Sequence, residues 1–99
     1  IILHHHYLIF LHCFHLYQIG LPIPWNRDDL VNYLKDWNIG CSVHFIPLHE
    51  HPHYHRENNR FEGCDKISQR NLSLPMDPGL NIDDIKYISD VVNQYKENL

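Results

Sequence analysis

The spacing of apolar residues predicts two amphipathic helices in the chain. In residues 26–38, apolar side chains recur every three or four positions and form one face, at Leu30, Val31, Leu34 and Trp37. From residue 81 onward the same spacing returns, at Ile85, Ile88, Val91, Val92 and Tyr95. One apolar face on each helix indicates that both helices pack against a common core.

The ends of both predicted helices carry residues that favour helix termini. Asn26 and Asn81 are suited to cap the first turn, because an Asn side chain accepts a hydrogen bond from a free backbone N–H there. Aspartates follow each cap closely, and their negative charge suits the positive end of the helix dipole. Asn38 is expected to adopt the left-handed conformation that ends the first helix.

Alternating apolar and polar residues predict two strands. Residues 14–19 (FHLYQI) form the first strand, which Gly20 ends. Residues 41–46 (CSVHFI) form the second strand, with Cys41, Val43 and Phe45 on the core side and His44 on the opposite, polar side. Pro47 prevents this strand from continuing as a central one.

Two shorter elements are expected between the second strand and the last helix. Residues 65–72 predict a short helix and residues 73–76 an extended segment, followed by a turn at Pro78 and Gly79. The order of elements therefore alternates strands with helices and ends in a long helix. This order predicts an α+β domain, in which a small sheet carries its helices on one side.

Length, charge and cysteine content exclude several classes of protein. Ninety-nine residues suffice for one domain, and a net charge of −4 without a basic stripe argues against a nucleic-acid partner. Three cysteines without a C-x-x-C pair favour a reducing, cytoplasmic location over a disulfide framework. No membrane span is expected, because the longest apolar run near the N-terminus is residues 7–11, against about 20 needed.

A histidine-rich segment offers one candidate chemistry. His49, His51, His53 and His55 alternate along the chain, so in an extended segment their side chains share one face. Two or three imidazoles on that face would suit Zn²⁺ or Ni²⁺. The alternative is a solvated histidine-rich loop, because Pro52 interrupts the run and no cysteine lies at ligand spacing.

Four ordered motifs resemble those of one known family. Residues 40–49 read GCSVHFIPLH and are followed by Pro52 and Tyr54. The other motifs are HLY at residues 15–17, the Arg27-Asp28 pair at the start of the first helix, and SLP at residues 73–75. Together they resemble the C-terminal domain of the DegT family of PLP-dependent aminotransferases, over about residues 13–95.

The resemblance implies a fold-type-I aminotransferase whose small C-terminal domain is an antiparallel sheet with helices on one side. It implies a nucleotide-linked keto-sugar as substrate, an amino donor such as glutamate, PLP held by the large domain, and a homodimer. It also implies that His44, Phe45 and His49 contact the substrate. An imidazole on a strand is held rigidly and bonds a sugar hydroxyl, which suits this role. The alternative is that His44 and His49 only satisfy buried backbone groups.

The chain departs from the family pattern in its lysines and in two segments. None of its lysines lies in a context resembling the PLP-binding lysine, so this chain alone is expected to be inactive. Residues 63–66 are shorter than the family's usual entry into the short helix, G-D-F-P-x-A-E-K. Residues 1–12 match nothing in the family. The four lysines of the chain, none of which resembles the PLP-binding lysine, are Lys35, Lys66, Lys86 and Lys96.

These departures indicate a part of a longer protein. Residues 1–12, which lack an initiating Met and the marks of a signal peptide, are unassigned or connect to a missing large domain. Residues 13–99 are expected to form the small domain and to expose apolar surface when alone. Two other interpretations remain. The parent protein is a related dehydratase that lacks the lysine, or the chain is a stand-alone histidine-rich metal-binding module derived from such a domain.

Overall fold

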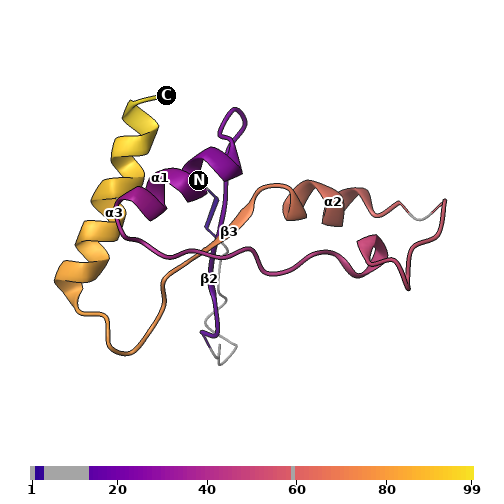
Figure 1. The fold of residues 1–99 in the computed structure, drawn as a ribbon, viewed down its shortest axis with the longest axis horizontal. Coiled ribbons are helices and arrows are strands. Elements are labelled where there is room, and N and C mark those ends of the chain that lie inside the picture. Colours follow the sequence, from indigo (N-terminus) through magenta and orange to yellow (C-terminus); the bar gives the residue numbers. More distant parts are fainter. Residues whose placement is uncertain (1, 4–13, 59) are drawn as a thin grey trace.

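An antiparallel sheet lies at the centre of the computed structural model, which describes residues 2–3, 14–58 and 60–99 (Figure 1). Within these residues the sheet has three strands in the order β1-β2-β3, namely β1 (Ile2–Leu3), β2 (Tyr17–Gly20) and β3 (Asn71–Leu74). β2 and β3 are distant in sequence, and their register pairs the buried residues Ile19 and Leu72. The predicted α+β class is confirmed.

The helix α1 spans Arg27–Asp36, and both of its predicted ends are confirmed. Asn26 is the N-cap, and its side-chain oxygen accepts a hydrogen bond from the Asp29 backbone N–H at 3.1 Å. Beyond the helix, Asn38 has a φ of 60°, which is the left-handed conformation that turns the chain away. The helix boundaries therefore follow from residues within the helix and directly beside it.

The helix α3 spans Ile82–Glu97 and begins with a capping box. The Asn81 side chain accepts from the Asp84 N–H at 2.8 Å, and the Asp84 carboxylate accepts from the Asn81 N–H at 2.9 Å. Ile85, which was predicted to face the core, is instead half-exposed because it borders a groove. The other four residues of the predicted apolar face are buried, namely Ile88, Val91, Val92 and Tyr95.

The core forms where α1 and α3 pack on each other and on the sheet. The Tyr95 ring of α3 contacts the rings of Trp25 and Tyr33, with centroids 5.2 and 5.3 Å apart. Side chains from β2, α1, β3 and α3 all contribute to the core. Its buried residues are Ile19, Leu21, Leu30, Leu34, Ile39, Leu72, Ile88, Val91, Val92 and Tyr95.

Between α1 and β3 the chain leaves this core in a long excursion (Figure 1). We call residues 43–68 the arm. It contains a short 3-10 helix, η1 (Leu48–Glu50), and returns to the sheet through the helix α2 (Glu62–Ser68), which has no buried residue. The Cα radius of gyration is 15.4 Å, above the roughly 13 Å of a compact 100-residue domain. The arm accounts for this extended shape.

The predicted strand at residues 41–46 is wrong. Only Ser42 forms a bridge, to Ser73 on the free edge of β3. Two residues later, the His44 carbonyl accepts hydrogen bonds from side-chain amides instead of from the backbone of β3, so the backbone pairing with β3 does not continue. The expected core side is also wrong for Val43 and Phe45, which are 39% and 69% exposed where the arm departs from the core. Cys41, the third residue expected on that side, is partly buried and packs against the core.

Three other predicted boundaries differ from the observed ones. The first predicted strand loses residues 14–16, and Phe14 has a φ of 49°, a left-handed conformation that a strand does not allow. The predicted helix at residues 65–72 corresponds to α2, which begins three residues earlier and ends at Ser68. Residues 71 and 72 belong to β3 instead, because they pair with β2.

The N-terminal segment is described only at β1. This strand pairs with β2 and was not predicted, and the remaining expectations for residues 1–12 lie outside the described residues. In the part of the chain that the structure describes, no helix has the length and apolar character needed to cross a membrane.

Candidate functional site

His44 lies at the root of the arm, beside β3. Its Nδ1 is 2.8 Å from the Ser73 hydroxyl oxygen, so one end of the imidazole is fixed to the strand. The ring of Phe45 meets the imidazole edge-on, with centroids 4.7 Å apart. The imidazole therefore has one nitrogen committed to the protein, and the other nitrogen, Nε2, remains for a ligand.

Two side-chain amides hold the backbone of His44. Its carbonyl accepts hydrogen bonds from Gln18 Nε2 of β2 and from Asn71 Nδ2 of β3, both at 2.7 Å. Asn71 is 6% exposed, and its amide would lack a partner there without this bond. The sequence analysis missed these supporting residues. The available signal was that Gln18 and Asn71 are amides beside apolar strand residues.

A cavity of about 200 Å³ opens beside the His44 ring. It lies between the start of β2, the segment that precedes the arm, and the end of β3. Burial raises the pKa of the Cys41 thiol in its wall, so this cysteine is protonated at neutral pH and a poor nucleophile. The lining residues are His15, Leu16, Tyr17, Gly40, Cys41, Ser42, His44, Ser73, Leu74, Pro75 and Met76.

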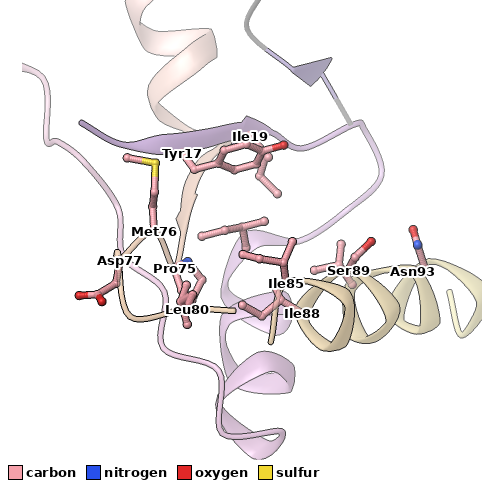
Figure 2. Close-up of a pocket in the computed structure, with 12 residues that line it drawn as sticks. Tyr17, Ile19, Pro75, Met76, Asp77, Leu80, Ile85, Ile88, Ser89 and Asn93 are labelled. Atoms are coloured by element: carbon pink, nitrogen blue, oxygen red, sulfur yellow. The ribbon is translucent and has the colours of Figure 1, made fainter. Parts of the chain in front are cut away.

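A second, larger groove adjoins this cavity (Figure 2). It measures about 380 Å³ and lies between β2, the turn after β3, and α3. The two hollows share Tyr17 and the segment 74–76 as walls. The walls of the groove are mainly apolar, with side chains from Ile19, Leu80, Ile85 and Ile88. A ligand would therefore find apolar contacts in the groove and polar partners in the His44 cavity.

His49 belongs to a different cluster, farther along the arm. Its Nε2 is 2.6 Å from Asp65 Oδ1 of α2, and its ring packs against Phe61 with centroids 4.8 Å apart. The His49 side chain is 13% exposed. The structure therefore brings His44 and Phe45 together and pairs His49 with Asp65, a partner that the sequence analysis missed.

The predicted row of four histidines on one face of an extended segment is wrong. His49 lies in η1, and the following residues turn, with the Tyr54 and His55 N–H groups both donating to the His51 carbonyl. A different set comes together instead. One ligand atom each from His49, Glu50 and Asp65 lies within 4.8 Å of the other two.

Comparison with known proteins assigns the chain to a family. The model of the DegT/DnrJ/EryC1/StrS aminotransferase family matches residues 3–93. The chain belongs to this family. The resemblance inferred from the GCSVHFIPLH and SLP motifs is thereby confirmed. The expectation that residues 1–12 match nothing in the family is wrong from residue 3 onward, because the match begins there. Aminotransferases of the DegT family generally use PLP.

Curated relatives of this DegT-family chain include proteins of sugar metabolism. The spore coat polysaccharide biosynthesis protein SpsC of Bacillus subtilis is 35% identical over 89 residues, which are 82% of this chain and 23% of that protein. The dTDP-4-amino-4,6-dideoxy-D-glucose transaminase of Shigella dysenteriae is 35% identical over 78 residues, 74% of this chain and 21% of that protein.

A third relative is the uncharacterized protein MJ1066 of Methanocaldococcus jannaschii. It is 39% identical over 93 residues, which cover 87% of this chain and 23% of that protein. The DegT-family chain therefore spans less than a quarter of the length of these three relatives.

The chain's own residues do not fit PLP as a self-contained site. A PLP enzyme of this type needs a lysine that reaches the cofactor in a cavity. All four lysines are exposed and lie on helices, and none lines the His44 cavity or the adjoining groove. They are Lys35 on α1, Lys66 on α2, and Lys86 and Lys96 on α3.

Proposed function

We propose that residues 13–99 are the C-terminal, substrate-facing domain of a PLP-dependent aminotransferase. The whole protein would convert a nucleotide-linked keto-sugar to an amino sugar, with an amino donor such as glutamate. The match to the aminotransferase family supports this proposal, as do the names of the relatives from Bacillus subtilis and Shigella dysenteriae. PLP would be held by a large domain, because the lysines of this chain do not fit it.

The observation that carries the proposal is the anchoring of His44 beside a cavity. Ser73 fixes one ring nitrogen, and two amides fix the backbone, so the imidazole cannot swing away from the cavity wall. Nε2 held in this way would bond a sugar hydroxyl without a further loss of side-chain conformational entropy, because the imidazole is already fixed. His44 would therefore orient the sugar.

Phe45 and His49 would support substrate binding in different ways. The Phe45 ring is 69% exposed next to His44, and an exposed aromatic face suits stacking on a sugar or base. His49 directs Nε2 at Asp65 and would mainly position the arm, which is a narrower role than direct contact. A homodimer and a cytoplasmic location complete the proposal, the latter because Cys41 and Cys64 are free thiols.

The test is steady-state kinetics of the whole protein with a keto-sugar nucleotide and glutamate. We expect His44→Ala to raise KM for the sugar nucleotide about tenfold or more, which corresponds to one good hydrogen bond at about 1.4 kcal/mol. His53→Ala is the matched control, because His53 is an exposed arm histidine whose ring, among the described residues, packs against that of the neighbouring Tyr54.

A conservative variant separates substrate contact from structural support. His44→Asn keeps a polar atom at the position of Nδ1, and therefore the bond to Ser73, but lacks the distal nitrogen. If Nε2 binds substrate, the Asn variant is as impaired as the Ala variant. Full recovery of KM in His44→Asn would show that His44 acts only through Ser73, and absence of amino transfer in the unmodified protein would refute the aminotransferase proposal.

A further inference from the structure

A mixed histidine and carboxylate cluster joins the two limbs of the arm. His49 and Glu50 belong to η1 on the outgoing limb, and Asp65 belongs to α2 on the returning limb. Their ligand atoms all lie within 4.8 Å of one another, and the closest pair, His49 Nε2 and Asp65 Oδ1, is 2.6 Å apart. Sixteen residues of sequence separate that pair, so the fold brings the cluster together.

We propose that His49, Glu50 and Asp65 bind a divalent transition-metal ion, Zn²⁺, which clamps η1 to α2. Zinc bonds to imidazole nitrogen and carboxylate oxygen are about 2.0–2.2 Å long, so tetrahedral ligand atoms lie about 3.4 Å apart. The His49 and Asp65 atoms, which are hydrogen-bonded at 2.6 Å, would open to this spacing around the ion, and the ligand atom of the exposed Glu50 lies within 4.8 Å of both. His49 would bind the ion through the lone pair of Nε2, so a coordinating imidazole carries its single proton on Nδ1.

The donor set favours zinc over the hard cations. Calcium takes six to eight oxygen ligands and magnesium keeps several waters in an octahedron, whereas one nitrogen and two carboxylates suit zinc. Three protein ligands leave a fourth position for water or for a neighbouring histidine. His55 is one candidate, because its Nδ1 lies 3.4 Å from the backbone carbonyl oxygen of His49.

The clamp would stabilise a part of the fold that has little else to hold it. α2 has no buried residue. Among the described residues, its side-chain bond to the outgoing limb is the one between Asp65 and His49, and the ring of Phe61, just before α2, packs against the His49 ring. A metal ion bonded to both limbs would therefore order the arm. The inference depends on this geometry alone and is independent of the proposed aminotransferase function.

The experiment is an isothermal calorimetric titration of the full chain with Zn²⁺. The chain carries no affinity tag, and bound metal is first removed with EDTA. We expect one tight site in addition to weaker histidine sites, and a loss of affinity of at least tenfold in both Asp65→Asn and Glu50→Gln. Glu57→Gln is the matched control, because Glu57 is an exposed carboxylate of the same arm outside the cluster. Weak Zn²⁺ binding by histidines outside the cluster is expected to be the same in every variant.

A second readout guards against variants that merely misfold. Glu50 is exposed, and its side chain forms no hydrogen bond or ion pair with the described residues, so Glu50→Gln is expected to keep the circular dichroism spectrum of the unmodified chain. Bound Co²⁺ is expected to show the intense visible bands of a four-coordinate site in the unmodified chain and in Glu57→Gln. Equal Zn²⁺ affinity in all four proteins, or a weak six-coordinate Co²⁺ spectrum in the unmodified chain, would overturn the proposal.

Discussion

Arg27 is expected to contribute more to stability than any other charged side chain near the arm. Its guanidinium donates from Nη1 to the Ser68 carbonyl at the end of α2, and also approaches the Asn71 carbonyl at 3.2 Å and the Asn71 side-chain oxygen at 3.3 Å. One side chain at the start of α1 thus binds both the returning end of the arm and the first residue of β3. Replacement by Ala removes all of these bonds together.

The expected loss can be worked out from these contacts. One nitrogen carries two hydrogens, so Nη1 makes two good bonds at a time, each worth about 1.5–3 kcal/mol for a charged donor. Arg27 is half-buried, and water would take over one of the freed carbonyls, which lowers the net loss to about 2–3 kcal/mol. At a urea m-value of about 1.5 kcal/mol/M, the unfolding midpoint would fall by about 1.3–2 M.

Urea unfolding followed by circular dichroism measures this loss, with Arg56→Ala as the control. Arg56 is an exposed arm residue whose side chain, within the part of the chain that the structure describes, bonds the carbonyl of the preceding His55 alone. Its loss is therefore expected to change stability by less than about 0.5 kcal/mol. Arg27→Lys is expected to fall between the two, because an ammonium group lacks the planar fork of a guanidinium. An Arg27→Ala midpoint equal to that of Arg56→Ala would refute the reasoning.

Two further predictions test the N-terminal cap of α3 and the reactivity of the Cys41 thiol in the cavity wall. Asn81→Ala removes the side-chain half of the capping box, the bond from the Asp84 N–H to Asn81 Oδ1, and is expected to cost about 1 kcal/mol in thermal unfolding. Gln94→Ala, at an exposed position of the same helix, is expected to be neutral. Burial raises the pKa of the Cys41 thiol above its usual value, so less thiolate is present at a given pH, and iodoacetamide should modify exposed Cys64 first. Peptide mass spectrometry resolves the two sites, and equal rates for both would contradict the burial of Cys41.

Helix ends were predictable from the sequence because their causes are local. Asn26 bonds a backbone group three residues away, and the Asn81 box also closes over three residues. Asn38 occupies the left-handed position directly after its own helix. In each case the residue type and its immediate neighbours contain the whole physical argument, and no distant part of the chain competes with it.

The strand at residues 41–46 failed for the opposite reason. Its alternation is real, but a strand also needs a ladder of hydrogen bonds with a partner strand, and within residues 41–46 only Ser42 forms a bridge to β3. The partners of His44 lie 26, 27 and 29 residues away in Gln18, Asn71 and Ser73, and no local pattern specifies them. The pairing of His49 with Asp65 is likewise a product of the fold, since it depends on how the arm returns.

These long-range contacts divide the arm into a fixed root and a less supported outer part. At the root, His44 is bonded to both β2 and β3, and at the return, Arg27 bonds the last residue of α2. Between these anchors the limbs are joined mainly at His49 and Asp65. Because the core holds both anchors, the geometry of the His44 cavity depends on the sheet and is expected to persist when the outer arm moves. The proposed substrate orientation at His44 and the proposed metal binding at His49 are therefore expected to be separable by mutation.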